Sequence, residues 1–317
     1  MSSKSNDNGR AYEYSYLLTL KKLLETKIHF VIEENSSFFA SKHAWNNTPN
    51  HEREHFLESA EAGIETLLEL EPLILEDKEN VLNICIQPDS KGVEGDVRDI
   101  LLIRDDISWG IGLSVKNNHF AVKHSRLSNK IDFAHNWFGE KCTDTYWNDI
   151  EPIFDYLNKE KAKARDWRDL PNKNEDVYVP LLAAFIKEIK VQYEIKGHII
   201  PTKMVEYLLG NYDFYKMINL NSKKITQTHT YNLRGTLNKS GKFSKPKIII
   251  PKSSLPTRII SLEFKHGSQN TVELYLDAGW SFSFRIHNAA TKVEASLKFD
   301  VQILGMPATI LVLNNKW

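Results

Sequence analysis

The segment from Gly95 to Lys116 constrains the fold more than any other part of the chain, because it predicts a β-hairpin. Residues 100–103 are a short apolar run of strand-forming residues, and Asp105 and Asp106 stand where a turn is expected. From 107 to 115, apolar side chains alternate with Gly and Ser, which is typical of a return strand. The segment therefore predicts two antiparallel strands joined by a tight turn.

Three polar residues of this hairpin do not suit a purely structural role. Asp99 opens an otherwise apolar strand, while Ser114 and Lys116 leave the same face of the return strand. Antiparallel pairing brings Ser114 roughly opposite residues 97–99, so that a carboxylate, a hydroxyl and an ammonium meet at one end. Such a group can hold a divalent metal ion and a water beside a phosphate. Asp96 competes with Asp99 for the carboxylate role, and Asp99 is favoured because it begins the apolar strand.

Length and charge set broad limits on the chain. With 317 residues it can form one large domain or two. It contains no run of 18 apolar residues, and its N-terminus lacks the apolar core of a signal peptide, so we expect a cytoplasmic protein. The net charge is zero, but residues 214–268 carry eleven Lys or Arg and the single acid Glu263. This excess suits a face that binds a polyanion, although a solvated lysine-rich surface is the alternative.

Hydrophobic periodicity predicts a mixed α/β (α+β) protein with a helix-rich first half and a β-rich second half. We expect residues 1–165 to form a core that contains the hairpin, 166–212 a helical linker region, and 213–317 a basic β-rich region that can be continuous with the core. Helices are expected at about 9–25, 50–70, 131–138, 144–163, 177–193 and 200–210. Strands are expected at 28–33, 81–87, 214–220, 225–233, 247–250, 258–264, 271–276, 281–286, 297–304 and 308–313.

Glu13 is an acid on the apolar side of the first predicted helix. It lies four residues before Leu17 and in phase with Leu20 and Leu24. A carboxylate on an apolar face is costly unless it is paired or binds a cation. A buried ion pair, a partly wet helix end and a cation site are all open for Glu13.

Two groups of hydrogen-bond donors suit phosphates or base edges. One follows the hairpin at 123–128, and the other lies on the predicted strand 281–287, where Arg285 and His287 share a face with Ser281 and Ser283. A polar helix end and the wet side of a sheet are the alternatives. The sequence lacks the GxxxxGK[ST], GxGxxG, HExxH and GxSxG motifs.

Four stretches resemble bacterial type II restriction endonucleases of the HaeIII type. They are NGRAYEY (8–14), GDVRDILLIR (95–104), IGLSVKNNHFAVKHSRLS (111–128) and WSFSFRIHNAATKVEASLKFDVQ (280–302). The resemblance implies a PD-(D/E)xK nuclease core, in which helices flank a mixed sheet. It also implies Mg²⁺ as cofactor, cleavage of duplex DNA within GGCC, and a companion methyltransferase that protects the host.

Within this resemblance, Asp99, Glu13 and the carbonyl of Val115 are expected to hold Mg²⁺, and Lys116 to orient the attacking water. Ser114 stands where the nuclease pattern usually has Asp or Glu, so one carboxylate is missing and the number of metal ions stays open. Ser114 is expected to hold a metal-bound water, and Glu13 to replace the missing ligand.

We expect DNA contacts from Lys123, His124, Ser125, Arg126, Arg285, His287 and Asn288. A palindromic site favours a homodimer, although a monomer that nicks each strand in turn is the alternative. Another PD-(D/E)xK nuclease with a role in repair or transposition, a DNA-binding module without catalysis, and a structural protein with a chance motif are the competing interpretations.

Overall fold

The computed structural model of the 317-residue chain describes all residues except 1–3, 77–79, 93–94, 121 and 124. Contacts group the chain into two compact units. The first comprises Met1–Phe120, Asn211–Ser253 and Ala308–Trp317, and the second comprises Ala121–Gly210 and Ser254–Pro307. These boundaries differ from residues 165 and 212, where the sequence predicts the chain to divide, and that division stays a prediction.

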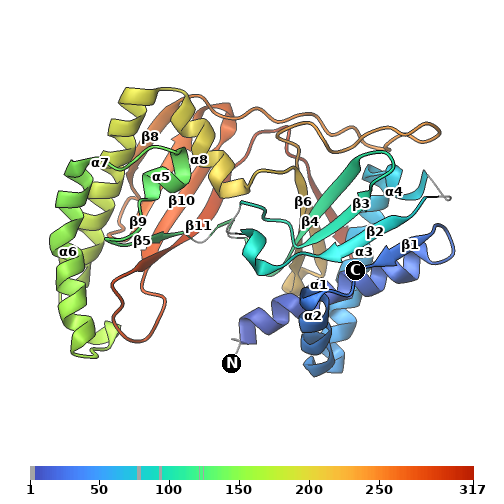
Figure 1. Cartoon of the computed structure of the whole chain (residues 1–317), viewed down its shortest axis with the longest axis horizontal. Helices are drawn as coiled ribbons and strands as arrows, with labels where there is room; N and C mark the ends of the chain where they lie inside the picture. Colours follow the sequence, from blue (N-terminus) through green and yellow to red (C-terminus); the bar gives the residue numbers. More distant parts are fainter. Residues whose placement is uncertain (1–3, 77–79, 93–94, 121, 124) are drawn as a thin grey trace. The chain divides into compact units, whose positions relative to one another are not determined.

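A seven-stranded mixed sheet forms the centre of the first unit (Figure 1). Its strands are β1 (Phe30–Ile32), β2 (Leu82–Ile86), β3 (Ile100–Arg104), β4 (Trp109–Asn117), β6 (Phe214–Leu220), β7 (Ile225–Tyr231) and β12 (Val312–Lys316). They lie in the order β1-β2-β3-β4-β6-β7-β12. The pairs β1–β2 and β4–β6 are parallel, and the other neighbours are antiparallel.

Helices pack against this sheet and close the core of the first unit. They are α1 (Lys4–Leu24), α2 (Ser36–Asn47), α3 (Asn50–Leu70) and the short α4 (Leu73–Glu76). α1 contacts β4, and α3 contacts β6, β7 and β12. The predicted stripe of α1 is buried with Leu113 and Val115 of β4, so hydrophobic burial fixes the helix on the sheet.

The second unit is built on an antiparallel sheet. Its strands are β5 (Arg126–Leu127), β8 (Ile259–Phe264), β9 (Thr271–Leu276), β10 (Ser281–His287) and β11 (Leu297–Gly305), in the order β5-β11-β10-β9-β8. Its helices are α5 (Phe133–Phe138), α6 (Asp144–Ala162), α7 (Val179–Lys196) and α8 (Ile199–Leu209).

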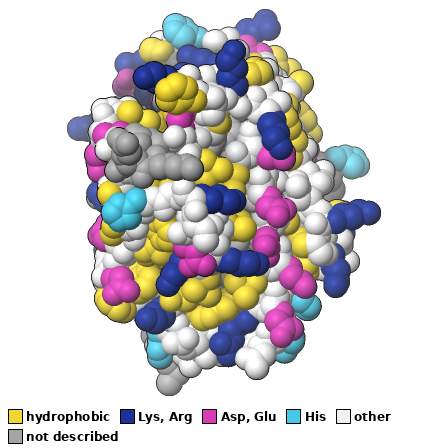
Figure 2. Space-filling model, turned by 90° about the vertical axis from the view of Figure 1, so that its right-hand side faces the viewer, with side chains coloured by type: hydrophobic (Ala, Val, Ile, Leu, Met, Phe, Trp, Pro, Cys, Tyr) yellow, Lys and Arg dark blue, Asp and Glu magenta, His cyan; other side chains and the backbone are white. Residues whose placement is uncertain are grey.

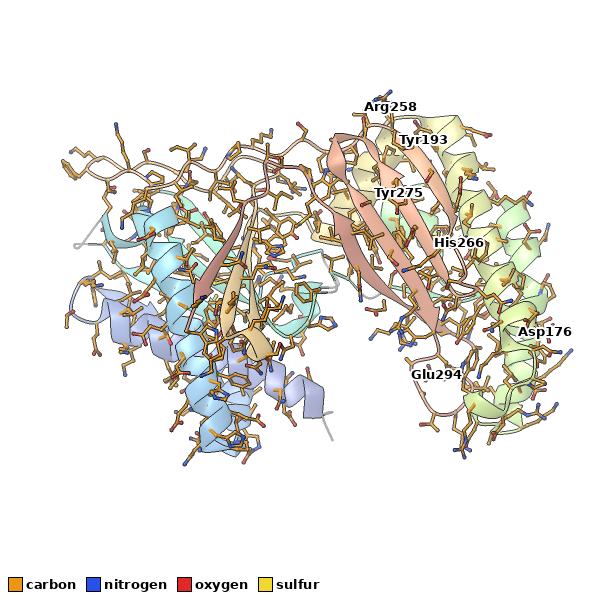
Figure 3. All side chains as sticks on the ribbon, turned by 180° about the vertical axis from the view of Figure 1, so that it is seen from behind. Asp176, Tyr193, Arg258, His266, Tyr275 and Glu294 are labelled. Carbon is orange, nitrogen blue, oxygen red and sulfur yellow. The ribbon has the colours of Figure 1, made fainter. Side chains whose placement is uncertain are left out.

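Aromatic side chains join the helices of the second unit to one face of its sheet. The ring of Phe284 lies 5.9 Å from Trp137 of α5 and 5.8 Å from Phe185 of α7. Figure 3 looks onto the opposite face, where the labelled Tyr275 is 43% exposed. The sheet therefore has one packed face and one solvated face, as the alternation in residues 281–287 predicts.

The predicted fold class is confirmed: helices flank a mixed sheet, and the C-terminal half is rich in β-structure. The strand predicted at 247–250 is wrong, because the amide of Lys247 donates to the carbonyl of Glu69 instead of to a neighbouring strand (3.0 Å). The last strand begins at Val312 instead of residue 308. None of the helices in the described ranges is long and apolar enough to cross a membrane.

Glu71, which directly follows α3, is a fully buried acid. Its Oε1 accepts hydrogen bonds from the Tyr215 hydroxyl (2.5 Å) and the Asn238 amide (2.6 Å). Within the described part of the chain its Oε2 is buried without a hydrogen-bond partner. Burial raises the pKa of Glu71 to about 7, because it outweighs the opposing effect of these hydrogen bonds. The fold therefore favours the protonated carboxyl group.

We expect Glu71→Gln to change how stability depends on pH. Wild-type stability from this group is fully present below its unfolded pKa of 4.5 and is lost as pH rises to about 7, because the folded state must then release a proton from a buried site. The variant lacks this titration. Its free energy of unfolding in urea, relative to wild type, should therefore rise by about 2 kcal/mol between pH 5 and pH 8.

The control for this experiment is Glu69→Gln, which changes an exposed glutamate two positions earlier. Its difference from wild type should be the same at both pH values. If the free energy of unfolding changed with pH in the same way for Glu71→Gln and wild type, the assignment of a raised pKa to Glu71 would be contradicted.

Candidate active site

The β3–β4 hairpin forms as the sequence predicts. The two strands pair from Ile100 with Leu113 to Arg104 with Trp109. One residue before β3, the amide of Asp99 donates to the Leu113 carbonyl (2.7 Å), which extends the ladder and places Asp99 beside the end of β4. The carboxylate, the hydroxyl of Ser114 and the ammonium of Lys116 thus come from one edge of the sheet.

Asp99 is held by two donors from β4. Its Oδ2 accepts hydrogen bonds from the Val115 amide and from the Lys116 Nζ, each at 2.8 Å. The side chains of Asp99 and Lys116 retain 20% and 30% exposure, so the pair is partly shielded but open to solvent. Burial alone would lower the pKa of Lys116, but the charge of Asp99 and its hydrogen bond raise it, so the lysine stays charged.

Glu13 of α1 lies within electrostatic range of this ion pair. Burial, followed by the charge of Asp99, raises the pKa of Glu13 to about 8, and Lys116 only partly offsets the effect. The Ser41 hydroxyl donates a long hydrogen bond to Oε2 of Glu13, at 3.4 Å. The helix thus brings a second acid to the hairpin, where the charge of Asp99 disfavours the ionised form of Glu13 and a nearby cation would favour it.

Asp96, the competing acid, is engaged elsewhere. Arg98 donates to both of its carboxylate oxygens (2.8 and 2.7 Å). Burial alone would raise the pKa of Asp96, but the hydrogen bonds from Arg98 and Gln87 lower it. The Arg98 side chain crosses β4 at Gly112, where a Cβ atom would overlap it. These contacts support Asp99 over Asp96 as the available carboxylate.

A buried lysine that sequence reasoning missed lies next to this group. Lys216 of β6 is paired in register with Ser114, and its Nζ donates to the Phe120 carbonyl (2.8 Å). Burial and the charge of Lys116 lower the pKa of Lys216 to about 7. In the sequence, Lys216 stands out as the single charged residue of the strand FYKMINL. That it lies beside Ser114 of β4 follows only from the parallel register of the two strands.

The donor set for a metal ion is small. Among the residues that the structure describes, no group of three or more His, Cys, Asp or Glu side chains is placed to hold a metal. Asp99 and Glu13 offer two carboxylates. Ser114 is buried, and its side chain offers a hydroxyl instead of a third carboxylate. A hard cation at this edge would complete its shell with a backbone carbonyl, such as that of Val115, and with water.

The first predicted group of DNA contacts lies in the second unit. The Nζ of Lys123 lies 3.9 Å from the centre of the Tyr207 ring, and burial lowers the pKa of Lys123. Ser125 is buried, whereas exposed Arg126 is 3.4 Å from a carboxylate oxygen of Glu294. His124 lies outside the described residues.

The second predicted group also lies in this unit, on β10 and the loop that follows. Exposed Arg285 pairs with Asp300 (3.1 Å), and His287 is half-buried. The side chain of Asn288 bonds to the carbonyls of Ala290 and Lys292, which holds its own loop. All of the described candidates for DNA contact therefore stay predictions, and both arginines already have acidic partners.

Comparisons with known proteins identify the family. The family model of the HaeIII restriction endonuclease matches residues 9–307. The chain is 52% identical over 317 residues to the type II restriction enzyme HaeIII of Haemophilus aegyptius, and the alignment covers 100% of this chain and 99% of that protein. No solved structure matches the chain. These matches confirm the predicted restriction endonuclease activity: the chain belongs to the HaeIII restriction endonuclease family.

Proposed function

We propose that this restriction endonuclease uses Mg²⁺ to hydrolyse phosphodiester bonds of double-stranded DNA within GGCC and leaves blunt ends. Enzymes of this class act on duplex DNA and are typically metal-dependent. The observation that carries the proposal is the Asp99 carboxylate, held between the Val115 amide and the Lys116 ammonium (2.8 Å each) within electrostatic range of Glu13. The GGCC site is the one that the resemblance to HaeIII-type enzymes implies.

Asp99, Glu13 and the Val115 carbonyl would hold Mg²⁺, a hard cation that prefers oxygen ligands. When bound, the metal supplies Lewis acidity toward the phosphate and lowers the pKa of a water. The charged Lys116 orients the attacking water and offsets the negative charge that develops on the phosphate in the transition state. Ser114 holds a water at the edge of the site, in place of the acid usual in PD-(D/E)xK nucleases.

The wider assignments follow from the same proposal. A palindromic target gives each strand an equivalent scissile bond, which favours a homodimer on DNA. A methyltransferase that modifies the same sequence would protect the host genome, as a genetic partner without physical contact. We place the protein in the bacterial cytoplasm, where that genome and foreign DNA meet.

Lys116→Ala should abolish most cleavage and spare binding. Loss of one charged donor at the phosphate costs at least about 100-fold in the cleavage rate. Binding to a GGCC duplex, measured by fluorescence anisotropy in EDTA, should remain close to wild type. Lys223→Ala, which removes an exposed lysine from the turn after β6, is the control and should cleave normally. Cleavage by Lys116→Ala at the wild-type rate would exclude this site.

Glu13→Gln should raise the Mg²⁺ concentration that gives half-maximal cleavage by at least about tenfold, because a charged oxygen ligand becomes a neutral one. Cleavage rates over a Mg²⁺ titration provide the measurement. Glu34→Gln, which changes an exposed glutamate of the same unit, should leave the midpoint unchanged. An unchanged midpoint in Glu13→Gln would show that α1 contributes no ligand.

Sequencing the ends of a digested plasmid tests the substrate assignment. We expect blunt ends within GGCC in Mg²⁺ and no cleavage in EDTA. Cuts at unrelated sequences would favour a PD-(D/E)xK nuclease with a role in repair or transposition. DNA binding without any cleavage in Mg²⁺ would favour a non-catalytic module.

A further inference from the structure

The connection that leaves β7 is a long loop rich in positive charge. We call residues 234–253 the basic loop. It belongs to the first unit, together with Asp99 and Lys116, and contains no helix or strand (Figure 1). It carries six Lys or Arg residues and no Asp or Glu. Loops of this length without regular structure are uncommon in compact proteins unless they serve a function.

Specific contacts between its two limbs hold the basic loop in shape. At the tip, the amide of Gly241 donates to the Ser244 carbonyl (2.9 Å), which closes a tight turn. Below the tip, the Asn238 side chain donates to the Ile248 carbonyl (3.0 Å) and accepts from the Ile250 amide (2.8 Å). Leu237 and Ile250 are buried in the core. The loop is thus a braced projection and not a slack linker.

Acids from α3 and α4 anchor the loop from below. Glu76 accepts hydrogen bonds from the Phe243 amide (2.9 Å) and from the Ser244 hydroxyl, and Glu69 pairs with Lys247 (2.7 Å). Apart from the Glu69–Lys247 pair, these anchors use backbone and hydroxyl groups of the loop. Most of the lysine charge therefore remains available on its surface.

The lysines of the loop are exposed. Lys239, Lys242, Lys245 and Lys252 face solvent, and within the described part of the chain none of them lies within ion-pair distance of a carboxylate. Phe243, at the tip, is 83% exposed and has the Lys242 ammonium 5.0 Å from its ring centre. In Figure 2, Lys and Arg side chains are spread over the face that it displays, and several of them lie at its top.

We propose that the basic loop is a docking surface for the phosphate backbone of duplex DNA, outside the cleavage site. This inference rests on the proposed function, since the DNA bound is the substrate. Exposed ammonium groups gain affinity for DNA by releasing its condensed counterions, and they do so without reading sequence. The bracing lowers the entropy cost, because the loop is already ordered before DNA arrives.

The test is the salt dependence of DNA binding by the full-length protein. We compare wild type with the triple variant Lys239→Gln, Lys242→Gln and Lys245→Gln. Anisotropy of a labelled duplex of about 30 base pairs, in EDTA, gives the slope of log K against log salt between about 50 and 200 mM. The slope should become shallower by about 0.9 for each phosphate that the variant no longer neutralises, by the same amount on GGCC and scrambled duplexes.

Two matched variants separate charge from structure. Lys→Arg at the same three positions keeps the charge and should keep the wild-type slope. Lys159→Gln, Lys161→Gln and Lys190→Gln remove three exposed charges from α6 and α7 and should also leave the slope unchanged. A triple variant in the loop with the wild-type slope would overturn the inference.

The outcomes for the two proposals stay distinct. Wild type that binds GGCC and scrambled duplexes equally, or that fails to cleave in Mg²⁺, would contradict the proposed specificity or reaction. The slope difference between wild type and the loop variant would still report on the docking surface alone.

Discussion

The parallel pairing of β4 with β6 is the contact on which the first unit depends. It joins residues near 115 to residues near 217 and makes one sheet out of the hairpin and the C-terminal strands. Parallel strands end at the same edge of a sheet, so the ends of β4 and β6 meet where Asp99 also lies. The pairing places Lys216 beside Ser114 and ties the acid–lysine group to a rigid support.

At that edge, the charged groups of Asp99 and Lys116 and the carboxyl group of Glu13 interact while they are partly shielded from solvent. Asp99 receives two hydrogen bonds, Lys116 keeps its proton, and Glu13 is driven toward its neutral form. An ionised Glu13 would repel Asp99 unless a positive charge lay near both. Lys116 supplies only part of that charge, which is why the proposed cation suits the group better than the lysine alone.

The local elements of this site follow from the sequence. The alternation of apolar and small residues predicts the hairpin. Helical periodicity places the acid Glu13 on the apolar face of its helix, and alternation in 281–287 separates a polar from an apolar face of that strand. The role of Lys216 depends on the register of strands a hundred residues apart, which no local pattern encodes. The error at 247–250 has a similar cause: an apolar, β-branched run favours a strand, but Glu69 and Asn238 bind its backbone instead.

The route of the chain has a consequence for how the protein is made. The crossover from β4 to β6 contains residues 121–210, which include α5, α6, α7 and α8 of the second unit. The sheet of the first unit therefore stays incomplete during synthesis until β6, β7 and finally β12 leave the ribosome. Such long-range pairing is slow to form, since a large loop must close first. Asp99 and Lys116 are therefore synthesised well before the strands that complete the sheet around them.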